Sequence, residues 1–268
     1  MIDSHCHLDF AVFADGLDQE LQACQRLGVS HVFIPGTVPD GWQRQLTLTK
    51  THEAIGIGLG CHPYFLTPQS PSALPQLASL LDQHPEILAV GEIGLDRHID
   101  VDWALQVAMF EQQCELANQY QRPVIVHHRR SHNDLIRQLK QRPVHCGGII
   151  HGFSGSLQDA ETYLDLGFLL GVGGTITYPR AHKTRQTICA LPLSALVLET
   201  DAPDMPLNGK QGQINRPRYL PEVATCLAAL RTESLADIAD ATTKNLSRLL
   251  RWPLPDASHD NATCKTSA

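Results

Sequence analysis

The sequence predicts a single-domain (β/α)8 barrel, and the repeated alternation of strand-like and helix-like segments is the main reason. Eight short runs of apolar and β-branched residues are separated by stretches with helical periodicity. Eight such units are the number that closes a parallel barrel, and 268 residues suit a fold of typically about 250. The predicted strands are 1–5, 29–35, 54–60, 87–94, 123–127, 147–151, 168–172 and 195–199.

An open, doubly wound sheet is the alternative architecture for alternating strands and helices. Such a sheet usually places a glycine-rich, phosphate-binding turn after its first strand, whereas this chain has the sequence Asp-Ser-His-Cys-His at 3–7. The barrel is therefore expected to occupy residues 1–255 as one domain. A polar, flexible tail is expected over 256–268.

Helix signals fall between the predicted strands. Residues 17–24 have amphipathic spacing, and a long helix is expected over 103–120, with apolar residues at 105, 107, 110, 114 and 117. Ser156, followed three residues later by Asp159, is typical of the start of a capped helix. Gly28 and Gly167 each follow an apolar periodic stretch, where glycine is typical of a helix end.

The composition narrows the functional classes. The formal net charge of −7 argues against a protein that coats nucleic acid through bulk charge, but not against an enzyme that grips one strand locally. No run approaches the roughly 18 apolar residues of a membrane helix, so no membrane partner is expected. The chain starts without a basic and then apolar leader, so no signal peptide is expected and the protein is predicted to be cytoplasmic.

Cysteines and histidines carry different information. The eight cysteines form no CxxC pair, which removes the zinc-ribbon and thioredoxin interpretations and favours reduced, mostly buried thiols. The fourteen histidines are an excess, and histidine is the commonest metal ligand. The composition therefore points towards metal chemistry.

Metal-ligand side chains recur at the ends of the predicted strands. In an extended segment, His5 and His7 point to the same side and can reach one ion. All strand C-termini of a barrel open onto one face, so ligand-type residues that follow different strands converge there. The others are Glu92, His127, His151 and Asp201. Six ligands exceed the three of an open catalytic zinc site and fit two ions that share a bridging carboxylate.

Six linked segments resemble the TatD family of metal-dependent hydrolases, within the amidohydrolase-type barrels. In family order they are Ile-Asp-Ser-His-Cys-His-Leu-Asp at 2–9, Gly-Cys-His-Pro at 60–63, Val-Gly-Glu-Ile-Gly-Leu-Asp at 90–96, Pro-Val-Ile-Val-His at 123–127, His-Gly-Phe-Ser-Gly at 151–155 and Leu-Glu-Thr-Asp-Ala-Pro at 198–203. The stretches 171–180 and 201–207 further resemble the YjjV-type branch of that family. The resemblance covers nearly the whole chain, to about residue 250.

The resemblance implies a division of labour between two divalent metal ions. The first ion would be held by His5, His7 and Asp201, the second by His127 and His151, and Glu92 would bridge them. The family is described as Mg²⁺- or Mn²⁺-dependent deoxyribonucleases. Histidine-rich coordination is softer than the all-oxygen shell that magnesium prefers, so Zn²⁺ or Ni²⁺ also suits a purified sample.

Four further residues are candidate substrate contacts. His62 ends the third predicted strand and could face a phosphate oxygen, or could be an ordinary loop histidine. Arg129 and Arg130 could offer charge to a phosphate, or could be a solvated basic pair. Asn215 matches a family element on the loop after the last strand and is expected to shape the mouth of the site.

Other positions near the ligands shape the pocket. Glu199 is expected on the same side of an extended strand as Asp201, where it would orient a ligand histidine or pair with an arginine inside the barrel. Four residues depart from the common family pattern without removing a ligand, and so change the pocket lining. They are Tyr64, Arg97, His128 and Gly152.

Hydrolysis of a phosphodiester, with a DNA or RNA end as substrate, is the leading functional prediction. Asp201 is the expected proton acceptor, and Glu92 is the second catalytic carboxylate. An amidohydrolase-type enzyme that cleaves a carboxylic ester, an amide or an aminoacyl ester fits the same residues. A metal-binding protein without catalysis would need closed coordination, which three ligands per ion do not provide. No coiled coil or long apolar stripe marks an obligate protein partner.

Overall fold

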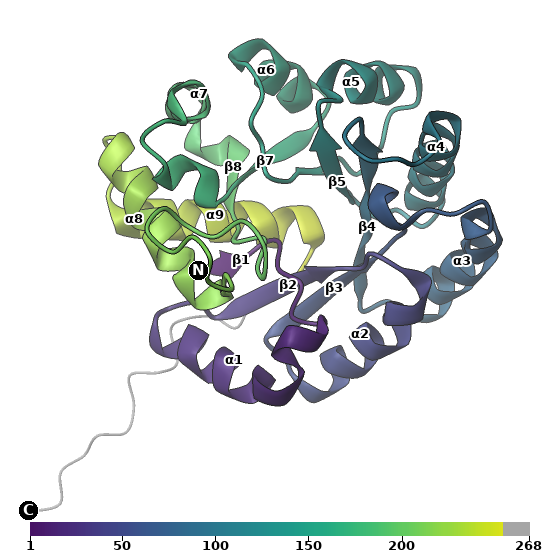
Figure 1. Ribbon diagram of the computed structural model, residues 1–268, viewed down its shortest axis with the longest axis horizontal. Coiled ribbons are helices and arrows are strands. Elements are labelled where there is room, and N and C mark those ends of the chain that lie inside the picture. The colour runs from purple at the N-terminus through teal and green to yellow at the C-terminus, as the bar shows by residue number, and fades with distance from the viewer. Residues whose placement is uncertain (254–268) are drawn as a thin grey trace, which may run out of the picture.

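Eight parallel strands form the barrel that the sequence predicts, with helices packed around the outside (Figure 1). The computed structural model describes residues 1–253, so the tail expected over 256–268 lies outside the described residues. Each strand pairs with the next along the chain, which excludes the reversal of strand order in a doubly wound sheet. The strands are β1 Ile2–Asp3, β2 His31–Pro35, β3 Ile55–Leu59, β4 Ile87–Asp96, β5 Val124–Arg129, β6 Gly148–Ile150, β7 Phe168–Val172 and β8 Leu196–Leu198.

Every predicted strand is present, and the differences are in length. β4 and β5 continue to Asp96 and Arg129, rather than ending at 94 and 127, because their last residues pair with each other. β1 ends at Asp3, and the segment that follows it turns to bond across the barrel seam. These boundaries matter because they decide which side chains reach the mouth of the barrel.

Nine α-helices lie in the described part of the chain: α1 Leu17–Arg26, α2 Pro39–Thr51, α3 Leu74–Gln83, α4 Trp103–Gln119, α5 His132–Gln141, α6 Leu157–Asp165, α7 His182–Ala190, α8 Leu220–Leu230 and α9 Leu235–Leu250. Short 3-10 turns span Ala11–Gly16, Pro63–Phe65, Ser70–Ala73, Gly174–Thr177, Leu193–Ala195 and Pro217–Tyr219. The predicted capping box is present, with Ser156 and Asp159 each accepting from the other's backbone N–H. Gly28 and Gly167 have φ of 84° and 86° just beyond α1 and α6, as expected for glycine at a helix end.

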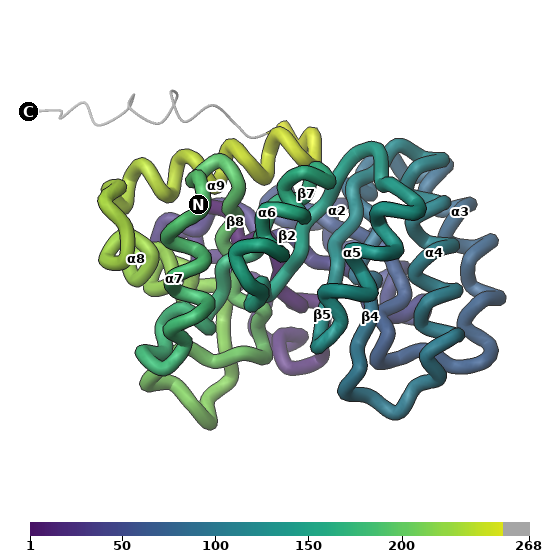
Figure 2. The backbone as a smooth tube through the Cα atoms, turned by 90° about the horizontal axis from the view of Figure 1, so that it is seen from above, coloured from purple at the N-terminus to yellow at the C-terminus, as the bar shows by residue number. Residues whose placement is uncertain are grey.

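Helix α9 covers the end of the barrel at which the strands begin (Figure 2). Leu246, Leu250 and Trp252 pack there against a layer of inward-facing strand residues that includes Phe33 and Ile149. The indole of Trp252 fills the space over β3 so closely that a Cβ at position 56 would lie 2.7 Å from the ring, which explains the glycine there. This end is closed by apolar packing, so a site for chemistry must lie at the other end.

The barrel seam joins the first and last strands through a short set of bonds. Ser4 donates its N–H to the carbonyl of Leu198 at 2.9 Å, and Thr200 donates its hydroxyl to the buried carboxylate of Asp3 at 2.5 Å. His7 N–H bonds to the carbonyl of Ala202 at 2.7 Å. The segments at 3–7 and 198–202, almost 200 residues apart in sequence, are thereby held side by side.

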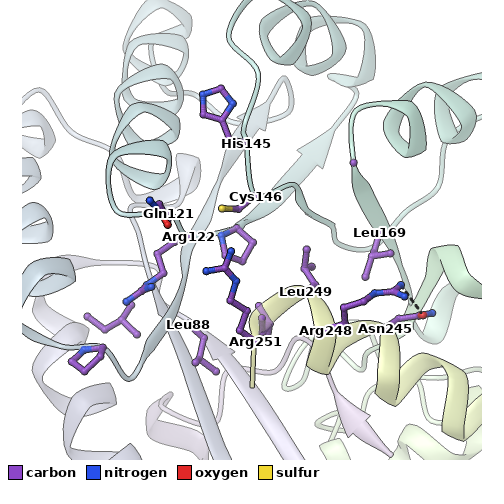
Figure 3. A pocket seen from close by; sticks show the side chains of 15 residues that line it. Leu88, Gln121, Arg122, His145, Cys146, Leu169, Asn245, Arg248, Leu249 and Arg251 are labelled. Atoms are coloured by element: carbon purple, nitrogen blue, oxygen red, sulfur yellow. Dashed lines mark hydrogen bonds between the residues drawn. The ribbon is translucent and has the colours of Figure 1, made fainter. Parts of the chain in front are cut away.

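A hollow of about 510 Å³ lies at the closed end (Figure 3). Its lining comes from the starts of β4 to β7 and from the C-terminal part of α9, including Arg248 and Arg251. None of the predicted site residues lines it. Within residues 1–253, no helix combines the length and the apolar character needed to cross a bilayer. The seven cysteines described there are unpaired, and four of them are buried.

Candidate metal centre

The six predicted ligands come from five different places in the fold and meet at the open end of the barrel. His5 and His7 follow β1, Glu92 lies within β4, His127 within β5, His151 directly after β6, and Asp201 after β8. Four of the six residues are less than one-tenth exposed: His5, His7, Glu92 and His151. The His127 side chain, within β5, is more exposed, and the Asp201 side chain is one-fifth exposed. Their ligand atoms form clusters within 4.8 Å of one another.

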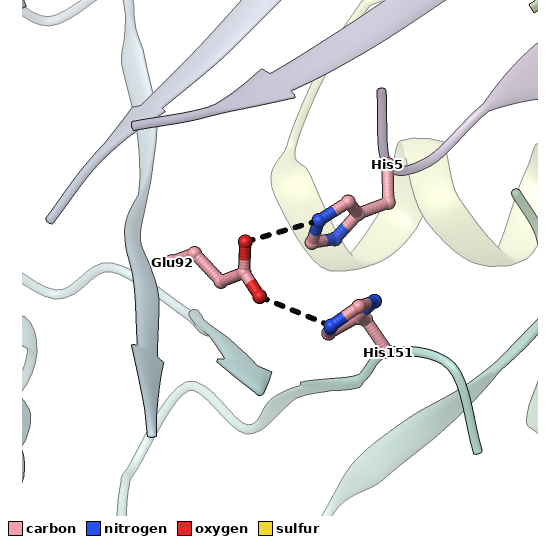
Figure 4. Close-up of side chains that lie close together, drawn as sticks. All are labelled: His5, Glu92 and His151. Carbon is pink, nitrogen blue, oxygen red and sulfur yellow. Dashed lines mark ion pairs between the residues drawn. The ribbon is translucent and has the colours of Figure 1, made fainter. Parts of the chain in front are cut away.

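The carboxylate of Glu92 lies at the centre and divides the cluster in two (Figure 4). Its Oε2 atom is 3.2 Å from His5 Nε2 and 3.6 Å from His7 Nε2. Its Oε1 atom is 3.0 Å from His151 Nε2 and 3.3 Å from His127 Nδ1. Each oxygen therefore faces its own pair of imidazoles.

Asp201 completes the first group, which we call the His5 cage: His5, His7, Asp201 and Glu92 Oε2. Asp201 Oδ1 is 3.6 Å from His5 Nε2 and 3.7 Å from His7 Nε2. Ligand atoms bound at about 2.1 Å to a shared cation lie roughly 3.0–3.5 Å apart. The atoms of the His5 cage are thus spaced only slightly wider than ligands around a common ion.

The second group, the His127 cage, consists of His127, His151 and Glu92 Oε1. The two ring nitrogens that face each other, His127 Nδ1 and His151 Nε2, are 3.3 Å apart. Two nitrogens at this distance cannot both carry a hydrogen without repulsion, but two lone pairs can point at one cation. The spacing again matches ligands around a common ion.

Asp96 fixes which nitrogen of His127 faces the cage. Asp96 Oδ2 lies 3.2 Å from His127 Nε2, so that nitrogen carries the proton and Nδ1 keeps its lone pair for the cage. The prediction from sequence missed Asp96. A signal was present, because Asp96 is the last residue of the family-like segment 90–96, two residues beyond the predicted strand 87–94.

His62 also lies beside the cluster, but it offers an N–H group where the cage histidines offer a lone pair. Its Nδ1 accepts the backbone N–H of Tyr64 at 3.1 Å, so a neutral ring carries its proton on Nε2. That Nε2 lies 3.3 Å from Glu92 Oε1. His62 is therefore arranged as a hydrogen-bond donor towards the cluster, which suits an oxygen atom better than a cation.

The buried donor set fits divalent metal ions. Nε2 of His5, which faces both Glu92 and Asp201, has no hydrogen-bond partner among the described residues, although buried polar atoms are nearly always bonded. Burial lowers the pKa of His5 well below its usual range and that of His7 to about 4, so both rings are neutral and keep lone pairs. Unsatisfied lone pairs beside carboxylates are what a divalent cation binds.

The two carboxylates of the cluster respond differently to burial. Burial alone would raise the pKa of Glu92, but the surrounding His62, His5 and His151 outweigh it and hold that pKa well below its usual range. Burial raises the pKa of Asp201 to about 7. Glu92 is therefore a fixed negative charge, whereas Asp201 exchanges a proton near neutrality in the metal-free protein.

Glu199 lies beside His151 rather than in line with Asp201. The expectation of one extended strand is wrong here, because β8 ends at Leu198 and Asp201 has a left-handed φ of 58°. Glu199 Oε1 accepts the N–H of Gly152 at 2.5 Å and is 3.8 Å from His151 Nδ1. The carboxylate lies beside a cage histidine without a hydrogen bond to it, so its role in orienting that ring stays a prediction.

The remaining predicted contacts lie away from the cluster. Arg129 and Arg130 are exposed and do not line the hollow at the open end. Asn215 is buried, and its amide donates to the carbonyl of Thr200 at 2.8 Å and to that of Met205 at 3.2 Å, which fixes the loop after β8. Direct substrate contact by these three residues stays a prediction.

A hollow of about 370 Å³ opens directly onto the cluster. Besides predicted site residues, its lining contains five side chains that the sequence did not single out as contacts. These are Phe10, Thr37, Tyr64, Phe65 and Asp204. An open space beside the cages is what a hydrolase needs for substrate and water. In a metal-binding protein without catalysis, protein side chains would close this space.

Comparison with known proteins agrees with this description. Residues 2–251 match the family model described as TatD related DNase. The uncharacterized metal-dependent hydrolase YjjV of Escherichia coli K12 is 44% identical over 254 residues, which cover 94% of this chain and 98% of that protein. An uncharacterized metal-dependent hydrolase of Haemophilus influenzae is 38% identical over 256 residues, covering 92% of this chain and 98% of its own length.

A crystal structure of YjjV, a TatD homologue from Escherichia coli K12, has a TM-score of 0.92 with this structure at 44% identity. The superposition covers 94% of this chain and 98% of that one. Barrel and donor cluster together define a metal-dependent hydrolase. The chain belongs to the TatD family, as the sequence motifs predicted.

Proposed function

We propose that this protein hydrolyses phosphodiesters at a centre of two divalent cations, acting on the end of a DNA or RNA strand. The observation that carries the proposal is the division of Glu92, whose two oxygens face separate cages. A single carboxylate placed between two donor groups is the usual bridge of a two-metal hydrolytic site. The His5 cage would hold one ion and the His127 cage the other.

The bound ions would lower the pKa of water and neutralise charge on the phosphate oxygens. Mg²⁺ or Mn²⁺ is the proposed physiological metal, and Zn²⁺ or Ni²⁺ suits the same histidine-rich donors in a purified sample. The rest of the mechanism belongs to residues of the chain. Glu92 and Asp201 set the charge of the cages, and the neutral rings of His5 and His7 supply lone pairs to the His5 cage.

Asp201 is the proposed general base. Its side chain is 20% exposed, compared with 3% for Glu92, and both line the hollow at the open end. Asp201 is therefore the carboxylate of the cluster that a water molecule in the hollow reaches most easily. It would accept the proton of that water as the water attacks phosphorus.

His62 is the proposed donor to a phosphate oxygen. Its Nε2–H points into the cluster because Nδ1 already accepts from Tyr64, and its side chain is 11% exposed to the hollow. A positioned donor stabilises the negative charge that develops in the transition state. This role needs a proton on Nε2, which the backbone contact supplies.

The test is reconstitution of metal-free protein with Mg²⁺, Mn²⁺ or Zn²⁺, each followed by assay against single-stranded DNA, RNA and a dinucleotide. A carboxylic ester, an amide and an aminoacyl ester complete the panel, because an uncharged substrate also fits a hollow to which residues 1–253 contribute no lysine or arginine. Elemental analysis of the protein as purified should give two ions per chain. Turnover confined to the ester and amide substrates would overturn the phosphodiester assignment.

A further inference from the structure

Two exposed aromatic side chains stand at the mouth of the catalytic hollow. Tyr64 is 61% exposed and Phe65 is 43% exposed. Among the large apolar side chains exposed in residues 1–253, these are the only aromatic ones, and both line this hollow. Exposed apolar surface gathered at one functional opening marks a binding surface.

The backbone couples these rings to the cluster. Tyr64 and Phe65 end the 3-10 turn Pro63–Phe65, whose first residue is a proline of fixed φ. His62 closes the turn from both sides, since Tyr64 N–H donates to its Nδ1 and Phe65 N–H donates to its carbonyl, each at 3.1 Å. The backbone that carries the two rings is therefore held in place beside the donor nitrogen of His62.

The rings present a ready surface for a planar group. The Tyr64 and Phe65 centroids are 5.0 Å apart, with their planes at 81°. Phe10 lines the same hollow and stacks on His7, with centroids 4.8 Å apart and planes 14° from parallel. We call Phe10, Tyr64 and Phe65 the aromatic rim.

Permanent positive charge is missing from the hollow's lining. No lysine or arginine of the described chain contributes to it, and Asp204 adds a negative group beside Asp201. A protein that follows a nucleic-acid backbone uses a positively charged groove. Here the cations of the centre can neutralise the phosphate at the reaction site, but no side chain of the lining can neutralise further phosphates.

We propose that the aromatic rim binds a nucleobase-type planar ring attached next to the scissile phosphodiester. The hydrolysis of the neighbouring phosphodiester rests on the proposed function, whereas the binding of the planar ring does not. Stacking on aromatic side chains is tolerant of base identity, because every base has a flat π-face. The substrate class is thus a nucleotide unit at the end of a strand, held by its base and not by its backbone charge.

The kinetic test compares three dinucleotides that differ only in whether each base is present. One is thymidylyl-thymidine, and the others are the same dinucleotide with either base replaced by an abasic tetrahydrofuran residue. Metal-loaded wild-type protein is expected to show a KM about tenfold or more higher for one abasic substrate, given the usual strength of base stacking. Tyr64→Ala and Phe65→Ala should raise KM for the dinucleotide but add little for that abasic substrate.

Matched variants separate stacking from general apolar contact. Tyr64→Phe keeps a ring and should keep the discrimination between substrates, whereas Tyr64→Leu keeps apolar bulk and should lose it. Leu235→Ala is the surface control, since Leu235 is as exposed as Phe65, at 43%, and starts α9 far from the rim. Equal KM for all three dinucleotides in wild-type protein would overturn the inference. So would KM increases in the alanine variants that are as large for the abasic substrates as for thymidylyl-thymidine.

A binding experiment keeps the inference testable if no phosphodiester is hydrolysed. Calorimetry on metal-loaded protein compares thymidine 5′-monophosphate with 2-deoxyribose 5-phosphate, which lacks the base. Tighter binding of the nucleotide, lost in Tyr64→Ala, supports the aromatic rim even when the proposed reaction fails. Equal affinities for the two ligands overturn the rim whether or not turnover is observed.

Discussion

Asp96 holds His127 by one ring nitrogen and so turns the other towards Glu92. Asp96 Oδ2 is 3.2 Å from His127 Nε2, and His127 Nδ1 is 3.3 Å from Glu92 Oε1. Both carboxylates come from the same strand, β4, which supplies one group to bind and another to orient. The length of β4 beyond residue 94 is therefore part of the site.

Asp96→Asn is expected to weaken metal binding in the His127 cage. The amide no longer favours a proton on His127 Nε2, and loss of such an orienting partner typically costs about 10- to 100-fold in metal affinity. Competitive calorimetry with a chelator should detect this weaker site. Asp102→Asn is the matched control, because Asp102 caps α4 by accepting from Leu105 N–H at 2.8 Å and asparagine caps equally well. If the affinity of the His127 cage for metal were unchanged in Asp96→Asn, the proposed orienting role of Asp96 would be wrong.

Asp201→Asn and Glu92→Gln should affect turnover in different ways. If Asp201 is the base, Asp201→Asn should lower kcat by about 10²- to 10⁴-fold, with a much smaller change in binding of a substrate analogue. Glu92→Gln should also lower the metal content, because Glu92 faces both cages. Elemental analysis beside steady-state kinetics separates the two. Near-normal kcat for metal-saturated Asp201→Asn would show that Asp201 is not the base.

Chelation should abolish turnover and leave most of the fold. The apolar core runs through all eight strands and is sealed by α9, so folding does not depend on the ions as it does in a zinc finger. Circular dichroism after chelation should keep its α/β signal, and added metal should restore activity. Wholesale loss of the signal would make the ions structural.

The ion pairs of Glu20 with two arginines, away from the candidate metal centre, are predicted to be sensitive to acid. Its buried carboxylate accepts from Arg216 Nη1 and from Arg218 Nε, each at 2.7 Å. Burial acts to raise the pKa of Glu20, but the two arginines outweigh it and lower the pKa below its ordinary value of 4.5. The carboxylate therefore stabilises the fold above that ordinary value, and this contribution disappears as pH falls through the lowered pKa.

Glu20→Gln should accordingly cost about 1–3 kcal/mol of unfolding free energy at pH 7, a range reduced because both arginines are one-third exposed. The difference from wild type should shrink below about pH 4 in urea titrations. Glu222→Gln is the control, since Glu222 is half exposed and pairs with Lys210 at the surface at 3.1 Å. A difference that grows as pH falls contradicts the assignment.

Salt should have little effect on the binding of short substrates. A single-stranded ligand contributes a slope of about 0.7 per neutralised phosphate in a plot of log affinity against log salt, so a dinucleotide in the hollow should give a slope near 1 or less. Arg129 and Arg130 lie outside the hollow, so we expect them to contact only longer strands. Arg129→Ala and Arg130→Ala should thus raise KM for a 20-nucleotide strand and not for a dinucleotide. A steep slope with the dinucleotide would point to basic contacts within the hollow.

The sequence was sufficient to predict the barrel because its strands are short apolar runs with no competing signal. Position at strand ends also predicted which side chains gather at the mouth, since barrel geometry converts that position into proximity. The family resemblance is confirmed by the match over residues 2–251.

The missed features depend on side-chain direction and on irregular backbone. Asp96 counts only because β4 continues past its apolar run, and that extension comes from pairing with β5. The left-handed φ of Asp201 breaks the alternation that placed Glu199 in line with it. Tyr64 was expected in the pocket lining, but Phe65 beside it was missed, because no periodicity in the sequence indicates where a 3-10 turn directs its rings.

The seam between 3–7 and 198–202 makes the His5 cage depend on two segments that are synthesised far apart in time. The segment with His5 and His7 leaves the ribosome first, but its hydrogen-bond partners and Asp201 emerge nearly 200 residues later. A nascent chain that ends before residue 198 can supply Glu92, His127 and His151 but cannot assemble the His5 cage. If both cages are needed for turnover, as proposed, a fragment that ends before residue 198 would be inactive.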